Sequence, residues 1–387
     1  MTGRRSFGTR TKRLIEEWLA TRTDDQLVRA NFGQQPSLAD IVKMVHPKPA
    51  TESRSALYAS IIGREHDRDA LPGLARELAE FRDGARTELP DVPLPILSGF
   101  SLTREHWIDI ARRAPYQTTR MQLNTFLRNG VFKDESMVKL IAERLRDREK
   151  IVRSGVQPHQ LLIGAQSLSA EMPSPIRLAL EEALEIAVET VPAWPGKLAI
   201  CVDVSGSMTW PLTGARKGAT SSVRCIDAAA LITAIALRRS PGATVVPFEQ
   251  SVVDVKLRGR DSIASTAERL ASVGGGGTNC SAAMRHLVKR NSDAELVVFV
   301  SDNQSWVDAR RGESGLLREW RRHLHRVPHA KLVCLDLQPY TDTPAVDAEN
   351  IRNFGGFSDA VFERIDEFAR SDGDPATWVA TIEAIEV

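Results

Sequence analysis

Oxygen-bearing side chains that suit a metal ion gather in three short segments of the C-terminal half. These are Asp203-Val204-Ser205-Gly206-Ser207, the four glycines that precede Thr278, and Ser301-Asp302. Mg²⁺ prefers about six hard oxygen ligands at roughly 2.0–2.1 Å and keeps several of its waters. Hydroxyls and carboxylates provide such oxygens, and glycines let the backbone approach an ion without a Cβ clash. The three segments therefore predict a site for Mg²⁺ or another divalent cation.

Buried parallel strands are the elements that would hold these segments. Continuous apolar runs of the right length occur at 198–202, 244–248, 296–300 and 332–335. Helical patterns fit between and after these runs, at 225–238, 263–271, 281–291 and 315–326. A short edge strand at 252–255 fits the same pattern. Alternating strands and helices predict a doubly wound α/β sheet, which binds ligands at the carboxyl ends of its strands.

The polar segments resemble a known metal site. A D-x-S-x-S motif, a distant threonine after a glycine run and an aspartate ending a later strand match the metal-ion-dependent adhesion site of von Willebrand factor A (vWA) domains. Ser205, Ser207 and Thr278 would then supply hydroxyl ligands, and Asp203 and Asp302 would hold coordinated water. In that family one metal position stays open for a partner's carboxylate. A domain that keeps these loops without binding metal is the alternative.

Other chemistry is less well supported by the residues. The segment Gly-Gly-Gly-Gly-Thr is not followed by Gly-Lys-Ser, so it does not match a phosphate-binding P-loop. The Asp203 segment lacks the second aspartate of an aspartyl phosphatase. His323, His325 and His329 are expected to be solvated residues near a helix end, since 323 and 325 lie on different helix faces. No acid–base pair or nucleophile–histidine set can be assembled, and we expect no enzyme activity.

Composition is that of an ordinary globular protein. The 387 residues are 42% hydrophobic and 26% charged, with a net charge of +1, so bulk charge does not indicate a nucleic-acid-binding protein. No run approaches the roughly 18 apolar residues of a membrane span, and the N-terminus lacks a secretory signal. The four cysteines are far apart, which suits buried thiols in a reducing cytoplasm. We expect a cytoplasmic protein without membrane association.

The N-terminal half has a helical pattern. Apolar residues recur at spacings of three and four up to about residue 190, with short breaks and no strand between. Successive helices of this kind predict stacked antiparallel pairs of the HEAT type. The pattern stops at a proline-rich linker. The predicted organisation is therefore multidomain: all-α HEAT-like repeats at 1–190, a linker at 191–197, and an α/β vWA-like domain with a C-terminal helix at 198–387.

Several helical segments resemble the Ro family, whose helical region is the TROVE domain. Residues 38–49, LADIVKMVHPKP, are similar to the family signature in which a helix ends in a basic His-x-Lys-Pro turn. Leu127-Arg128-Asn129 and residues 154–165, SGVQPHQLLIGA, resemble two further family segments. A helical array followed by a vWA domain with this metal site is also the layout of the family.

The resemblance implies a toroid of helical repeats that binds RNA. Members bind Y-type noncoding RNA on the outer surface and pass single-stranded ends of misfolded RNA through the hole. In bacteria the RNA can tether the ring to an exoribonuclease, so the family acts as an adaptor in RNA quality control. The rival hypothesis is a protein–protein scaffold that acts through the metal site without RNA.

The same resemblance suggests which residues bind RNA. His46 in the signature turn is the first candidate, with Lys43 and Lys48 beside it; a capping role for His46 and solvation of the lysines are the alternatives. Weaker candidates are four arginines that could equally be exposed helix faces, namely Arg112, Arg113, Arg120 and Arg128.

The start of the chain departs from the family pattern. Residues 4–18 already resemble the middle of the helical array, so we expect the first helical pairs of a typical member to be missing. About five pairs fit before residue 191, too few to close a ring. We expect either an open crescent or a homo-oligomer that completes the ring, and we favour the oligomer slightly.

Overall fold

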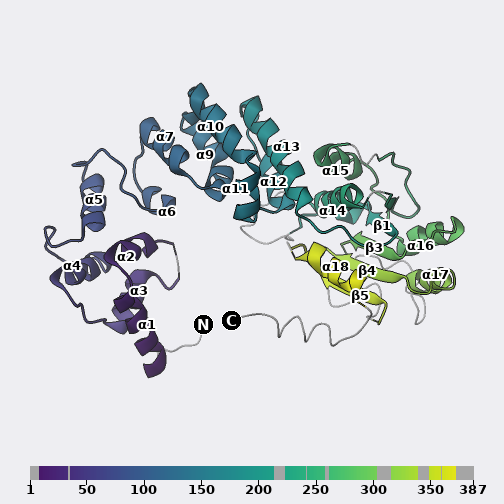
Figure 1. Cartoon of the computed structure of the whole chain (residues 1–387), viewed down its shortest axis with the longest axis horizontal. Helices are drawn as coiled ribbons and strands as arrows, with labels where there is room; N and C mark the ends of the chain where they lie inside the picture. The colour runs from purple at the N-terminus through teal and green to yellow at the C-terminus, as the bar shows by residue number, and fades with distance from the viewer. Residues whose placement is uncertain are drawn as a thin grey trace. The chain divides into compact units, whose positions relative to one another are not determined.

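The computed structural model describes residues 8–33, 35–212, 223–240, 242–257, 261–302, 315–338, 348–358 and 360–371. Its internal contacts divide the chain into two compact units. Unit 1 comprises residues 1–114 and 125–137, and unit 2 comprises residues 115–124 and 138–387. The described residues up to Glu189 form helices and the segments that connect them, and the first strand begins at Leu198 (Figure 1). The predicted fold class, a helical region followed by a parallel α/β domain, is confirmed.

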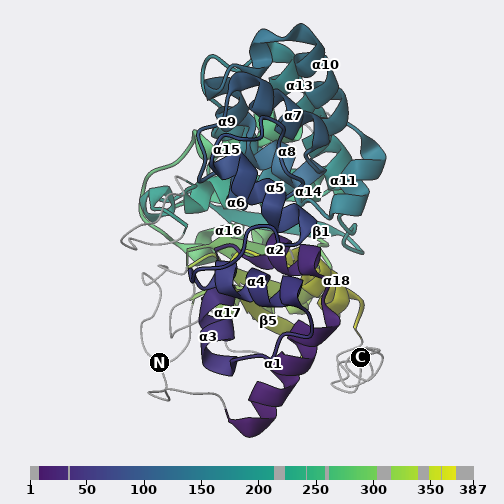
Figure 2. The same ribbon diagram turned by 90° about the vertical axis from the view of Figure 1, so that its left-hand side faces the viewer.

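Unit 1 is built from short helices. They are α1 (Thr9–Thr21), α2 (Asp24–Ala30), α3 (Leu38–Val45), α4 (Glu52–Ile61), α5 (Gly73–Arg82), α6 (Leu94–Leu97) and α7 (Arg104–Arg113), then part of α9 (Leu123–Arg128) and η1 (Val131–Lys133). Helix α3 contacts both α1 and α4 (Figure 2). Two of these helices begin at a side-chain cap, because Ser37 and Thr103 each form a capping box with the residue three positions later.

A half-buried arginine joins the first helices of unit 1. Arg54 on α4 pairs with Asp24 at 2.5 Å and donates to the carbonyl oxygens of Leu19 and Arg22. Leu19, Leu27, Val42 and Leu57, from four different helices, form part of one apolar cluster. Helix α3, which carries Val42, is therefore packed against its neighbours just before the turn that follows it.

Four helices of the helical region pack within unit 2. They are α8 (Tyr116–Met121), α11 (Arg148–Ser154), α12 (Pro158–Gln166) and α13 (Ser174–Glu189), and most of α10 (Glu135–Leu145) joins them. Glu185 on α13 pairs with Arg238 at 2.5 Å and accepts a hydrogen bond from the backbone N–H of Ile263. The boundary between the two compact units therefore lies before residue 138, whereas the first strand begins only at Leu198.

A parallel sheet forms the centre of the vWA-like part of unit 2. Its strands are β1 (Leu198–Asp203), β2 (Thr244–Phe248), β3 (Leu296–Ser301), β4 (Lys331–Asp336) and β5 (Ile351–Gly355), and the described strands are ordered β2-β1-β3-β4-β5. The sequence predicted the first four within one residue at each end and missed β5. Residues 252–255 form no strand, because Val252 makes only an isolated bridge to Phe248.

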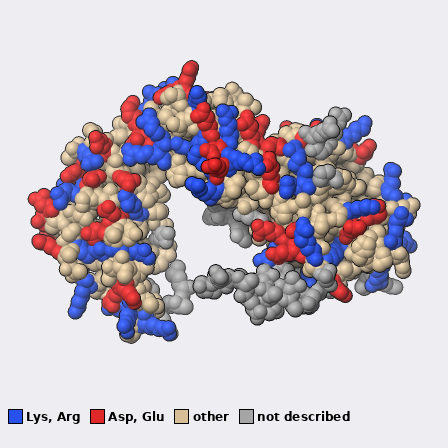
Figure 3. All heavy atoms as spheres, viewed as in Figure 1, with Lys and Arg blue, Asp and Glu red and all other residues tan. Residues whose placement is uncertain are grey.

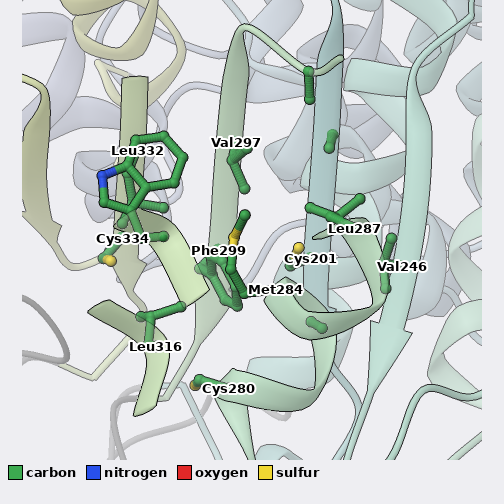
Figure 4. Close-up of a cluster of buried hydrophobic side chains, with 14 of the residues drawn as sticks. Cys201, Val246, Cys280, Met284, Leu287, Val297, Phe299, Leu316, Leu332 and Cys334 are labelled. Carbon is green, nitrogen blue, oxygen red and sulfur yellow. The ribbon is translucent and has the colours of Figure 1, made fainter. Parts of the chain in front are cut away.

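Helices cover both faces of this sheet. In Figure 1, α14 (Cys225–Arg239) and α15 (Ile263–Ala271) lie on one side, and α16 (Cys280–Lys289) and α17 (Gly315–Leu324) lie on the other. A further helix, α18 (Val361–Arg370), follows β5. Figure 4 shows the apolar cluster between the strands and α16 and α17, with Cys201 on β1, Met284 on α16 and Cys334 on β4.

The remaining sequence expectations have mixed outcomes. All four cysteines are buried and free, as predicted. The expectation for His323 was wrong: this side chain is 2% exposed, stacks on Trp320 and bonds to the carbonyl oxygen of Ala294 at 2.8 Å. His325 and His329 are exposed as expected. Within the described part of the chain, no helix is both long and apolar enough to cross a membrane.

Candidate functional site

The candidate metal site lies at the carboxyl end of the sheet. Asp203 is the last residue of β1 and is fully buried. Ser301 is the last residue of β3, and its Oγ donates to Asp203 Oδ2 at 2.7 Å. The parallel register sets Ser301 directly opposite Asp336, the last residue of β4. Three neighbouring strands therefore end in a row of buried oxygen-bearing side chains.

The predicted hydroxyl ligands meet at Ser205, which is itself bonded to Asp203. The backbone N–H of Ser205 donates to Asp203 Oδ1 at 2.9 Å, and Ser205 Oγ lies 3.2 Å from Ser207 Oγ. Thr278, from the glycine-rich segment, donates its hydroxyl to Ser205 Oγ at 2.8 Å. The structure thus brings together side chains separated by more than seventy residues.

Asp302 belongs to the same site. It follows Ser301 directly and is 1% exposed, and its charge raises the pKa of Asp203. All five residues of the predicted metal site therefore lie at one end of the sheet. Whether they bind a metal stays a prediction.

The glycines are required by close backbone contacts. Gly274 has a positive φ of 89°, and a Cβ there would lie 2.0 Å from the carbonyl oxygen of Val204. Gly206 donates its N–H to the Gly276 oxygen at 2.9 Å, and a Cβ on Gly206 would come within 3.0 Å of the Gly275 oxygen. A side chain at Gly274 would push apart the two loops that carry the hydroxyls, because a non-glycine residue there is both strained and obstructed.

Sequence reasoning missed three residues of this region as parts of the site. Ser301 was visible as the neighbour of Asp302, but its bond to Asp203 was not. Glu249, directly after β2, accepts a hydrogen bond from the backbone N–H of Gly276 at 2.6 Å and so orients the glycine loop. Asp336 belongs to no recognised motif. The only sign of its role in the sequence is that it directly follows the last predicted strand.

Burial makes the site costly for negative charge. Desolvation raises the pKa of Asp203 to about 6; hydrogen bonds from Ser205 and Ser301 oppose this rise, and the charge of Asp302 adds to it. Desolvation and Asp302 likewise raise the pKa of Asp336 to about 7. A cation at these oxygens would relieve the repulsion between the carboxylates.

The donor set fits a hard divalent cation. Its atoms are hydroxyl and carboxylate oxygens, and no histidine or thiol ligand is among them. Across the described residues, no group of three or more His, Cys, Asp or Glu side chains is arranged to hold a metal. A cation here would therefore depend on the hydroxyls of Ser205, Ser207 and Thr278 and on water, as the motif predicts.

The candidate RNA-binding residues of the signature turn are exposed together. Helix α3 ends at Val45, and His46 follows in the left-handed conformation with φ 53° and ψ 56°. Its backbone N–H bonds to the oxygen of Val42, so the main chain of His46, rather than its imidazole, caps the helix. Lys43, His46 and Lys48 are all exposed on this turn of unit 1.

The four candidate arginines differ in their contacts. Arg113 pairs with Asp109 one turn earlier on α7. Arg120 is half-buried, and its guanidinium donates to the carbonyl oxygen of Gln160 at 3.0 Å, so it joins α8 to α12. Arg112 and Arg128 are exposed. Their roles in RNA binding stay predictions, and Arg120 is the one most engaged in internal packing.

The raised pKa values predict how stability depends on pH. Because an unfolded aspartate has a pKa of about 3.9, Asp203 and Asp336 hold more protons in the folded than in the unfolded protein between about pH 4 and pH 7. In metal-free protein these two groups should therefore lower stability as pH rises from about 4 to 7, and Asp203→Asn should make this loss smaller, mainly below about pH 6. Melting temperatures recorded at a series of pH values in the presence of a chelator measure this loss of stability. An equal slope in parent and variant would show that Asp203 does not titrate in this range.

Three comparisons relate the chain to known proteins. A family model described as the Ro60 vWA domain matches residues 197–369. The "RNA-binding protein RO60" of Deinococcus radiodurans is 25% identical over 292 residues, which are 70% of this chain and 54% of that protein. The protein of the same name from Caenorhabditis elegans is 24% identical over 246 residues, 61% of this chain and 37% of that protein. The chain thus spans about half or less of the length of these relatives.

A solved structure has the same fold. The crystal structure of the Deinococcus radiodurans RO (RSR) protein aligns with a TM-score of 0.63 at 22% sequence identity, covering 94% of this chain and 77% of that one. The similarity includes the helical region as well as the sheet, whereas the family model matches the sheet domain alone. Residues 197–369 therefore match a vWA domain of the Ro60 type, and the chain as a whole shares the fold of the solved RO protein.

Proposed function

We propose that this chain is an RNA-binding adaptor of a Ro-like ribonucleoprotein and not an enzyme. The observation that carries the proposal is its similarity, over 70% of its length, to a protein named as RNA-binding. Within that proposal, the RNA is a Y-like noncoding RNA or the single-stranded end of a misfolded RNA, bound for quality control. An exoribonuclease that shares the RNA would carry out any degradation.

The basic turn after α3 supports a phosphate contact. Lys43 and Lys48 flank His46 in the sequence, and all three side chains are exposed. Elsewhere on the visible surface, acidic and basic residues are interspersed, without a broad single-sign face (Figure 3). Binding would therefore depend on particular positive groups rather than on the net charge of +1.

The vWA domain would add a cation-dependent contact. When bound, a divalent cation would supply a positively charged position that a partner's carboxylate can ligate. This chain's own residues would orient it: Asp203 fixes Ser205, and Thr278 and Ser207 hold their hydroxyls beside that of Ser205. Trp210, three residues after Ser207, is 59% exposed and offers an apolar contact next to the site.

This arrangement also favours a second candidate function, a protein scaffold that acts without RNA. An exposed tryptophan beside a carboxylate-binding site is a common feature of protein interfaces. Examination of the protein isolated from its own cells distinguishes the two functions. A high ratio of absorbance at 260 and 280 nm that ribonuclease abolishes favours the adaptor, and a protein free of RNA favours the scaffold.

The first functional prediction concerns the basic turn. His46→Asn with Lys48→Gln should weaken RNA binding and flatten its salt dependence, because each lost contact to a single strand lowers the log–log slope by about 0.7. Asparagine tolerates the left-handed conformation of His46, so the melting temperature should change little. Gel-shift titrations at several salt concentrations measure both quantities.

A matched control is available on another exposed lysine. Lys150→Gln removes one charge from α11, where the lysine pairs with Asp147 outside the signature turn. It should leave RNA affinity nearly unchanged. Equal binding by the parent and the double variant would remove the turn from the RNA site.

A further prediction concerns the independence of the two sites. Ser205→Ala and Thr278→Ala should each weaken Mg²⁺ binding, so that Mg²⁺ raises the melting temperature of the variants less than that of the parent. RNA affinity should be retained, because the candidate RNA residues lie outside the sheet domain. A collapse of RNA affinity in either folded variant would contradict this separation.

A further inference from the structure

Asp336 lies in line with the proposed metal site but is not part of the recognised motif. It ends β4 and is 3% exposed. It stands opposite Ser301, whose hydroxyl bonds to Asp203. Cys334, two residues earlier, packs in the cluster beneath α16 and α17. Since side chains alternate along a strand, Asp336 points to that same face, at its open carboxyl end.

The side chain of Asp336 has an oxygen without a partner. Its Oδ1 is inaccessible to solvent and accepts no hydrogen bond from any described residue. The nearby backbone donors are already used: Gly356 N–H bonds to the Asp336 carbonyl oxygen at 2.7 Å, and Leu337 N–H bonds to that of Ser301 at 2.8 Å. On the next strand the residue opposite is Gly355, which has no side chain to donate.

An unpartnered carboxylate oxygen in this place requires an explanation. A buried polar group without a hydrogen bond costs roughly 1–3 kcal/mol, and more when it is charged. Asp336 also lies at the same end of the sheet as two other buried acids, Asp203 and Asp302, and all three are at most 3% exposed. A donor that is bound rather than built into the chain would satisfy the free oxygen.

We propose that Asp336 is a third carboxylate of the divalent cation site, whose Oδ1 accepts a hydrogen bond from a water molecule on the cation. Direct ligation is disfavoured, because the described acids do not form a group that could surround one ion. Mg²⁺ retains several of its waters when bound to proteins, and those waters need acceptors. The site then extends over three strands, β1, β3 and β4, rather than two.

This inference rests on the proposed metal site and predicts a specific effect on it. Asp336→Asn in the full chain should lower the affinity for Mg²⁺ by about tenfold or more, the usual effect of losing an outer-shell partner. The metal-free variant should be at least as stable as the parent at neutral pH, because a buried unpartnered charge is removed. Calorimetric titration with Mg²⁺ and melting curves in chelator measure the two effects.

The control is Asp261→Asn in the same domain. Asp261 pairs with Arg269, which is 44% exposed, and takes no part in the row of strand ends. The Asp261→Asn protein should bind Mg²⁺ as the parent does. If the parent itself does not bind Mg²⁺, the proposed metal site fails. If the parent binds and Asp336→Asn binds equally well, only the role of Asp336 fails.

A second measurement needs no substitution, in case Asp336→Asn does not fold. In the parent protein, the ¹³C signal of the Asp336 side-chain carboxyl should shift as Mg²⁺ is added, in step with that of Asp203. A signal that stays fixed at saturating Mg²⁺ while that of Asp203 moves would overturn the proposal.

Discussion

The burial of like-charged carboxylates at the ends of neighbouring parallel strands is the constraint on which the site depends. Asp203, Asp302 and Asp336 lie almost entirely out of water, and the charge of Asp302 raises the pKa of each of the other two. Hydrogen bonds from Ser205 and Ser301 stabilise the Asp203 carboxylate. A sheet that merely needed a stable end would place apolar side chains there. The arrangement is therefore best explained as a site prepared for positive charge.

The rest of the vWA domain holds that end of the sheet in place. The parallel register aligns the last residues of β1, β3 and β4, and the cluster beneath α16 and α17 fixes the face on which they stand. The glycine loop approaches β1 so closely that Gly274 cannot carry a side chain, and Glu249 orients the loop from the neighbouring strand. Thr278 reaches Ser205 because these backbone contacts bring the two loops together.

The sequence was sufficient for the parts of the molecule that depend on local pattern. Continuous apolar runs predicted four strands, and D-x-S-x-S with Thr278 predicted residues that do meet in space. Strand β5 was missed because Arg352 and Asn353 interrupt its residues Ile351–Gly355, which form no continuous apolar run. Asp336 and His323 were misjudged for a related reason, since their burial depends on tertiary packing that no local motif records.

The helical region illustrates the same limit for RNA binding. A basic turn can be read from the sequence, and the structure places Lys43, His46 and Lys48 on the surface. Arg120 was a weaker candidate by sequence, and its guanidinium bonds within the helical packing. Charge alone does not distinguish an arginine that meets phosphate from one that joins two helices. The contacts of each guanidinium are needed to do so.

The claim that this sheet end is built for a divalent cation is tested most directly by counting bound metal. Equilibrium dialysis of metal-free protein against Mg²⁺, followed by metal analysis, should find one saturable ion per chain in the parent and none in Asp203→Ala. If the parent retains no Mg²⁺ above the buffer level, or if the folded variant retains as much as the parent, the buried carboxylates have another purpose and the account of the site is wrong.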